Sequence, residues 1–177
     1  MEIRLTTDGD LPAIRDILNR EIAENFAHFG TAPETTESVR AQWAAAPDLV
    51  RWVTAHTGSE VMGFARGGPW KRREAYRWSA EVSVYVSPAY HRRGVGRALY
   101  ARLFDELKRA GYRRLIGGIA LPNKASVRLH ESMGMRKVAH FERTGFKMGR
   151  WIDVAYWQID VGHEAQPIEP PADALDT

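Results

Sequence analysis

The chain has 177 residues, 44% hydrophobic and 27% charged, with no cysteine, which fits one folded domain and excludes disulfides, thiolate catalysis and cysteine-ligated metal centres. Its net charge is +3, but residues 162–177 hold four acidic side chains and no Lys or Arg, so residues 1–161 carry +7. A globular part this basic suits an anionic ligand, either a nucleotide cofactor or a nucleic acid.

Three features of the chain bear on its location and domain boundaries. No run of about 18 apolar residues is present, so we expect no membrane-spanning helix and no membrane partner. Residues 1–5 alternate charged and aliphatic side chains, unlike a signal peptide, and the missing cysteines fit a reducing compartment, so we expect a cytoplasmic protein. The proline-containing acidic segment 162–177 predicts a disordered tail, which leaves residues 1–161 as a single domain.

The N-terminal part of the chain predicts a strand, two helices and a hairpin. Residues 2–6 alternate in the manner of a short strand, and apolar residues recur at helical spacing over residues 11–22, with Asp8 or Asp10 as the expected cap. Residues 25–33 contain glycine and proline and predict a loop. The next expected elements are a short helix and two hairpin strands, at residues 35–45, 49–56 and 61–66.

The C-terminal part of the chain continues the alternation of strands and helices after a break expected at Gly67-Gly68-Pro69. Residues 81–86 are rich in β-branched side chains and predict a central strand. The later elements are a helix, a strand, a helix and two aromatic strands, at residues 95–110, 115–121, 123–133, 135–147 and 151–160. The complete order is β-α-α-β-β-β-α-β-α-β-β, which predicts an α/β fold whose mixed sheet carries helices on both faces.

The turn between the central strand and the following helix carries the clearest chemical signal. Residues 91–97 read His-Arg-Arg-Gly-Val-Gly-Arg, so amide groups, the helix dipole and arginines would face an incoming anion, and the glycines would let a phosphate approach the main chain. A Walker loop requires a Gly-Lys-Ser/Thr ending that is absent. A dinucleotide-binding loop requires a third glycine where Leu99 stands. A plain helix N-terminus with solvated arginines is the remaining alternative.

Four separated blocks of the sequence resemble the GNAT superfamily of N-acetyltransferases, and within it the phosphinothricin acetyltransferase branch. Residues 91–96 match the acetyl-coenzyme-A (acetyl-CoA) pyrophosphate loop, Gln/Arg-x-x-Gly-x-Gly/Ala, except that His91 stands at the first position. The other blocks are residues 68–71 with 81–86, residues 121–131, and residues 145–158. The wider resemblance covers nearly all of residues 1–161. The resemblance implies the GNAT acyl-CoA N-acyltransferase fold, acetyl-CoA as cosubstrate and a homodimer.

The resemblance implies two catalytic residues. Glu81 matches the position of the proposed base, and strand alternation places residues 81, 83 and 85 on one face; a glutamate facing solvent at a strand edge is the alternative. His130 shares a helical stripe with Asn123 and would donate a proton to the leaving thiolate. A structural histidine, hydrogen-bonded between helix and sheet, is the alternative for His130.

The remaining site residues follow from the same resemblance. Strand amides would polarise the thioester, the glycine turn would hold the pyrophosphate, and the helix after residue 121 would contact the pantetheine arm. The expected cofactor-binding residues are Val84, Tyr85, Val86, Arg92, Arg93, Gly94, Val95, Gly96, Arg97, Asn123 and Ser132. The expected acceptor-binding residues are Phe26, Phe29, Arg73, Glu74 and Tyr76. Glu74 could repel a carboxylate, and residues 70–78 could equally form a solvated basic loop.

The acceptor implied by this branch is a small amino-acid-like amine of the phosphinothricin or methionine sulfoximine type. A peptide or protein N-acetyltransferase and a non-catalytic acyl-CoA-binding protein are the main alternatives. A nucleic-acid-binding domain would need the cations on one face with stacking aromatics, and the four blocks outweigh it, so we expect no nucleic-acid partner. His130-Glu131-Ser132-Met133-Gly134 lacks the second histidine of a zinc motif, and we expect no metal.

Overall fold

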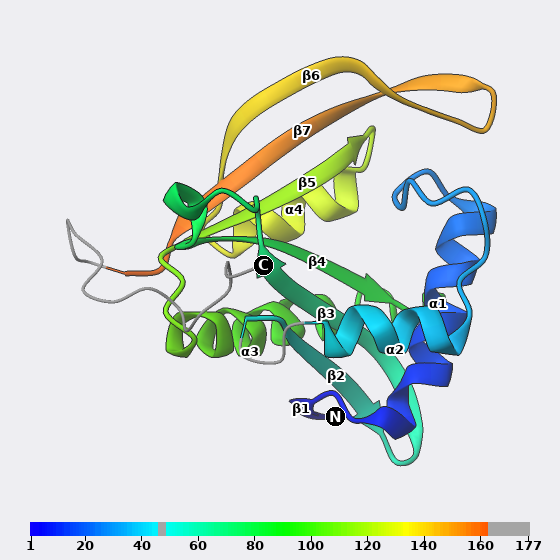
Figure 1. The fold of residues 1–177 in the computed structure, drawn as a ribbon. Helices are drawn as coiled ribbons and strands as arrows, with labels where there is room; N and C mark the ends of the chain where they lie inside the picture. Colours follow the sequence, from blue (N-terminus) through cyan, green and yellow to red (C-terminus); the bar gives the residue numbers. More distant parts are fainter. Residues whose placement is uncertain (46–48, 163–177) are drawn as a thin grey trace.

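The computed structural model describes residues 1–45 and 49–162, and Figure 1 shows a sheet with helices on both faces. The helices are α1 (Leu11–Glu24), α2 (Thr36–Ala44), α3 (Val95–Arg109) and α4 (Lys124–Ser132). The strands are β1 (Glu2–Leu5), β2 (Arg51–Thr57), β3 (Glu60–Pro69), β4 (Ser79–Val86), β5 (Arg114–Leu121), β6 (Arg136–Lys147) and β7 (Arg150–Asp160). Short 3-10 helices at Asp8–Asp10, Glu74–Tyr76 and Pro88–Tyr90 are added to the predicted order, which is otherwise confirmed.

The sheet is mixed and opens in its middle. Its strand order is β1-β2-β3-β4-β5-β7-β6, and β4 and β5 form its parallel pair. Their ladder covers residues 79–81 of β4 and 114–116 of β5, although both strands continue beyond it. The main chains of β4 and β5 therefore separate after Glu81, which leaves a gap in the centre of the sheet. Each of the other neighbouring pairs is antiparallel.

Two hydrophobic cores cover the two faces of the sheet. One lies under α3 and α4 and buries Leu99, Leu103 and Leu107 completely. The other lies under α1 and α2. Because neighbouring strand residues point to opposite faces, Val53 belongs to the first core and Trp52 to the second. The gap between β4 and β5 therefore lies between two packed layers.

Two local predictions are corrected by the fold. Gly67-Gly68-Pro69 does not break the chain: it forms the end of β3 and pairs with residues 80–82 of β4. A proline fits there because it stands at the strand terminus. Asp10 does not cap α1 with its side chain; its carboxylate instead accepts hydrogen bonds from the Arg4 guanidinium at 2.7 and 2.9 Å and from the Thr7 main chain at 2.8 Å.

The β6–β7 hairpin extends past the rest of the sheet in Figure 1. Four large apolar side chains of the hairpin are exposed: Phe141 at 51%, Phe146 at 59%, Met148 at 51% and Trp151 at 55%. No helix in the described ranges is long and apolar enough to cross a membrane. Of the predicted tail, residues 163–177 lie outside the part of the chain that the structure describes.

Candidate active site

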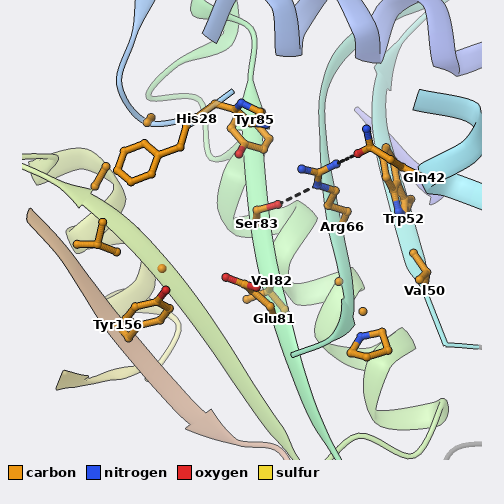
Figure 2. A pocket seen from close by; sticks show the side chains of 18 of the residues that line it. His28, Gln42, Val50, Trp52, Arg66, Glu81, Val82, Ser83, Tyr85 and Tyr156 are labelled. Atoms are coloured by element: carbon orange, nitrogen blue, oxygen red, sulfur yellow. Dashed lines mark hydrogen bonds between the residues drawn. The ribbon is translucent and has the colours of Figure 1, made fainter. Parts of the chain in front are cut away.

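A cavity of about 600 Å³ opens on the α1–α2 face of the sheet, beside the gap between β4 and β5. Strands β3, β4, β5 and β7 and the segment after α1 line it. Figure 2 shows the β4 side chains Glu81, Ser83 and Tyr85 along one wall and Tyr156 of β7 across from Glu81. The predicted alternation of residues 81, 83 and 85 is therefore present, and it puts a carboxylate inside the cavity.

The Glu81 carboxylate is available for proton transfer. It has no hydrogen bond or ion pair with any side chain in the described part of the chain. Glu81 is exposed to the opening of the cavity, but partial burial of its carboxyl raises its pKa, and the positive charges of Lys71 and Arg66 offset this only in part. A carboxylate with a raised pKa, open to a cavity, is suited to general-base chemistry near neutral pH.

His130 lies on the other face of the sheet. Its Nδ1 is 2.8 Å from the Ser126 carbonyl oxygen, which only accepts, so Nδ1 carries the proton. The Tyr100 hydroxyl then donates to Nε2 across 3.1 Å. The ring occupies the space above Gly117, where an added Cβ would lie 2.5 Å from Nε2.

His130 is 3% exposed and does not line the cavity. Its burial lowers its pKa, which favours the neutral ring. This geometry supports the alternative in which the histidine joins α4 to α3 and β5, and the proton-donor role stays a prediction.

The glycine turn has the geometry of an anion-binding helix N-terminus. Gly94 begins α3 with a φ of 79°, a left-handed conformation that favours glycine. The first amides of α3 have no acceptor within the helix. An added Cβ on Gly96 would lie 3.1 Å from Leu129 of α4 and 3.8 Å from Val86 of β4, so this terminus lies close to both the end of β4 and α4.

The other predicted cofactor residues surround the same region. Arg97 donates to the Ser132 carbonyl oxygen at 2.8 Å and so joins α3 to α4. Asn123 caps α4 by accepting a hydrogen bond from the Ser126 amide at 3.0 Å. The β4–β5 ladder ends before Val84–Val86, so the main-chain groups of that segment that point toward β5 are not part of a ladder there. Arg92 has a φ of 60°, and the Arg93 guanidinium lies over the Tyr90 ring.

Of the predicted acceptor residues, Phe29 alone lines the cavity; it packs against Gly145, where an added Cβ would lie 2.3 Å from the ring. Phe26 instead contacts the Arg150 guanidinium. The other three predicted residues, Arg73, Glu74 and Tyr76, lie in and just before the 3-10 helix after β3 and do not line the cavity. There Glu74 forms an ion pair with Arg77.

Sequence reasoning missed several lining residues, among them Arg66, His28 and Tyr156. Arg66 carried a usable signal, because it is the one charged residue between Val61 and Pro69. A charge inside a strand of small and apolar residues commonly has a specific partner or function. In the described ranges, no group of three His, Asp or Glu side chains is arranged to hold a metal ion.

Comparison with known proteins identifies the family. The family described as acetyltransferase (GNAT) matches residues 12–135. A phosphinothricin N-acetyltransferase of Streptomyces viridochromogenes is 37% identical over 94% of this chain and 91% of the relative. An L-methionine sulfoximine/L-methionine sulfone acetyltransferase of Salmonella typhimurium is 34% identical over 94% of this chain and 98% of the relative.

Solved structures agree with the sequence relatives. A GNAT superfamily phosphinothricin acetyltransferase from Sinorhizobium meliloti, in complex with acetyl-CoA, has a TM-score of 0.92 and 27% identity. The match covers 98% of this chain and 97% of that one. The chain belongs to the acetyltransferase (GNAT) family and has its fold, which confirms the resemblance and the expected enzyme class, an N-acetyltransferase.

Proposed function

We propose that this enzyme moves the acetyl group of acetyl-CoA to the primary amine of a small amino-acid-like acceptor, of the phosphinothricin or methionine sulfoximine type. The observation that carries the proposal is the Glu81 carboxylate, unpaired among the described residues and with a raised pKa, in a cavity beside the β4–β5 gap. The names of the two curated relatives support the same acceptor class.

Acetyl-CoA fits the anion-binding end of the gap. The free amides at the start of α3 and the nearby arginines provide a site for a pyrophosphate, and Gly94 allows the turn that presents them. The pantetheine arm would then extend along the opened edge of β4 and bring the acetyl thioester toward Glu81. The complex of the Sinorhizobium meliloti relative supports acetyl-CoA as the cosubstrate.

The proposed reaction is a direct attack. Glu81, itself or through a water molecule, takes a proton from the acceptor ammonium, and the neutral nitrogen forms a bond to the thioester carbonyl carbon. Main-chain amides of Val84–Val86 donate to the oxygen on which negative charge develops. As the carbon–sulfur bond breaks, the nitrogen loses its second proton to solvent and the departing thiolate takes up a proton, with Glu81 or solvent as donor. The products are the acetylated amine, free CoA and one proton. His130, held by Tyr100 and Ser126, keeps α4 against the sheet in this scheme.

The size of the cavity favours a small acceptor over a peptide. Its volume of about 600 Å³ is within the usual range for small-molecule sites. The tip of the β6–β7 hairpin closes one side, because the Lys147 ammonium donates to the carbonyl oxygens of Asn25 at 2.6 Å and His28 at 2.7 Å. A peptide acetyltransferase would need an open groove at this position.

A homodimer is part of the proposal. The exposed Phe146, Met148 and Trp151 at the hairpin, with Phe141 further along β6, supply apolar surface of the kind that protein interfaces cover. β6 is also a sheet edge whose main chain has one paired side. A second copy of the chain is the expected occupant.

The test is an assay of free-thiol release from acetyl-CoA with phosphinothricin, methionine sulfoximine, methionine sulfone and common amino acids. Glu81→Gln is compared with Glu2→Gln, a matched change on the exposed edge strand β1. Turnover that is lost in the Glu81 variant and kept in the Glu2 variant supports the proposal. Unchanged turnover of Glu81→Gln contradicts the base assignment, and no transfer to any small amine contradicts the function.

A further inference from the structure

Arg66 of β3 is a cation that reaches the cavity wall without an acidic partner in the described residues. Its Nη1 donates to the Gln42 amide oxygen at 2.8 Å, and its Nε donates to the Ser83 hydroxyl at 3.3 Å. The guanidinium carbon lies 5.1 Å from the centroid of the Trp52 ring. Figure 2 shows Arg66 between Gln42 and Ser83. These neutral contacts orient the guanidinium and leave its charge uncompensated.

The strand register places this charge in the same cavity as the Glu81 carboxylate. Arg66 pairs with Ser83 across the β3–β4 ladder, and Glu81 is two residues further along the same face of β4. The Arg66 and Glu81 main chains are therefore diagonal neighbours, about 7–8 Å apart. The two side chains form no ion pair within 4.0 Å, although the Arg66 charge lowers the pKa that burial raises in Glu81. The cavity thus offers one positive and one negative pole to a small molecule.

We propose that Arg66 binds the α-carboxylate of the acceptor while the acceptor's amine faces Glu81. This inference rests on the proposed acetyl transfer and identifies the residue that selects amino acids among amines. A zwitterionic amino acid carries an ammonium and a carboxylate on one carbon, so its two charges can contact Glu81 and Arg66 at the same time. A guanidinium binds a carboxylate through its planar fork of N–H groups. Arg66 Nη2 has no hydrogen-bond partner within the described part of the chain.

The basic segment after β3 also brings positive charge near Glu81, because Lys71 lowers the pKa of that carboxyl as Arg66 does, but its side chains do not line the cavity. Of the described side chains that line the cavity, Arg66 is the only one with a permanent positive charge. Arg73 does not line the cavity, Arg77 is paired with Glu74, and the Lys71 ammonium lies 5.2 Å from the Trp70 ring centroid. The carboxylate is therefore assigned to Arg66, the cation that lines the cavity.

The experiment removes the anion from the acceptor and the cation from the enzyme, separately and together. Methionine sulfoximine is compared with its α-amide and its decarboxylated amine, for the wild type, Arg66→Gln and Arg66→Lys. Phosphinothricin and its decarboxylated analogue, which keeps the phosphinate, separate an α-carboxylate from a distal anion. Arg109→Gln is the matched control, because the Arg109 side chain is 69% exposed on α3, on the other face of the sheet.

The expected result is coupling between the two changes, so that their effects on kcat/KM are not additive. In the wild type and Arg109→Gln, removal of the carboxylate lowers kcat/KM about 10- to 100-fold. In Arg66→Gln the same removal changes kcat/KM less than about threefold, while the KM for acetyl-CoA is unchanged. Arg66→Lys keeps a preference for the acid of intermediate size. A purely structural Arg66 would lower activity on the acid and the amide equally.

Several results would overturn the inference. They are an equal cost of carboxylate removal in wild type and Arg66→Gln, and coupling to the phosphinate instead of the carboxylate. Equal rates of acetyl transfer to amines with and without the carboxylate overturn this inference alone. No transfer to any amine overturns the proposed function as well.

A measurement on the wild type covers the case in which Arg66→Gln fails to fold. The deamino acid that corresponds to the acceptor should compete with the acceptor and not with acetyl-CoA, and its amide should not compete. Equal inhibition by the acid and the amide also overturns the assignment.

Discussion

Replacing Lys147 with Met should loosen the wall of the acceptor cavity. The Lys147 side chain is almost fully buried, and its ammonium donates to the carbonyl oxygens of Asn25 at 2.6 Å and His28 at 2.7 Å. Burial lowers the pKa of Lys147, and Glu21 opposes this shift. Methionine preserves most of the apolar stem but removes both charge-assisted hydrogen bonds. These bonds attach the segment that carries His28 and Phe29, which line the cavity.

The size of the effect follows from these two bonds. With a net contribution of about 1–1.5 kcal/mol from each, Lys147→Met lowers the free energy of unfolding by about 2–3 kcal/mol. For a domain of this length, each kcal/mol corresponds to about 2–4 °C, so the melting temperature falls by about 4–12 °C. The KM for the acceptor should rise about threefold or more, while the KM for acetyl-CoA should stay constant, because the anion-binding turn is not attached to Lys147.

The assay combines thermal unfolding, followed by circular dichroism, with initial rates at varied acceptor and varied acetyl-CoA. Lys108→Met is the control, since Lys108 is exposed on α3 and should change stability by less than about 0.5 kcal/mol. A Lys147 variant that melts within a degree of the control, with an unchanged acceptor KM, would refute the argument that this lysine holds the cavity wall.

Further predictions concern Glu81, His130, the Asp10–Arg4 pair and the hairpin. Burial raises the pKa of Glu81, and a general base must be ionised to work. The kcat/KM should therefore fall as pH decreases, with a midpoint above the pKa of an ordinary glutamate. A kcat/KM that does not change with pH would contradict this prediction. Burial lowers the pKa of His130 in the folded protein, so below pH 6.5, about the pKa of an unperturbed histidine, the unfolded chain binds more protons than the folded one. The stability that His130 contributes should therefore be complete above about pH 6.5 and decrease below it. If His130→Gln leaves the slope of melting temperature against pH unchanged, this prediction is wrong. Burial alone would raise the pKa of Asp10, but hydrogen bonds from Arg4 and Thr7 lower it. Asp10→Asn should therefore lower the free energy of unfolding by about 1–2 kcal/mol at neutral pH, a modest value because Arg4 is partly exposed. In acid unfolding, this difference from wild type should vanish below the lowered pKa. Trp151→Ser, which removes a side chain 55% exposed on the hairpin, should shift a dimer toward monomer in light scattering, and an unchanged mass would exclude this surface as the interface.

Periodicity predicted the order of the elements because it depends on neighbours a few residues apart. The apolar spacing over residues 95–107 places one face of α3 on the sheet, and alternation along β4 places Glu81, Ser83 and Tyr85 together. The αL conformation of Gly94 is local in the same way, since it follows from the turn that starts a helix directly after residues 91–93. Such features need no knowledge of the rest of the fold.

The errors of prediction arose where distant segments compete for local groups. Gly67-Gly68-Pro69 has the composition of a break, yet pairing with β4 extends the strand through it. Asp10 has the position of a cap, yet the Arg4 guanidinium, supplied by β1, is the stronger partner for its carboxylate. Local propensity is a weak preference that one strand pairing or one ion pair outweighs.

The sequence alone determined the element order, the family and the residue that we propose as the base, because these depend on local patterns and on motifs that are contiguous in the chain. Only the tertiary structure decided which side chains share the cavity. Strand pairing brought Arg66 next to Ser83, and β7 brought Tyr156 to the same wall from a distant part of the chain. It also moved His130 to the opposite face of the sheet from Glu81. The physical reason is that register and layer packing relate residues far apart in sequence, and spacing along a single chain carries no measure of that distance.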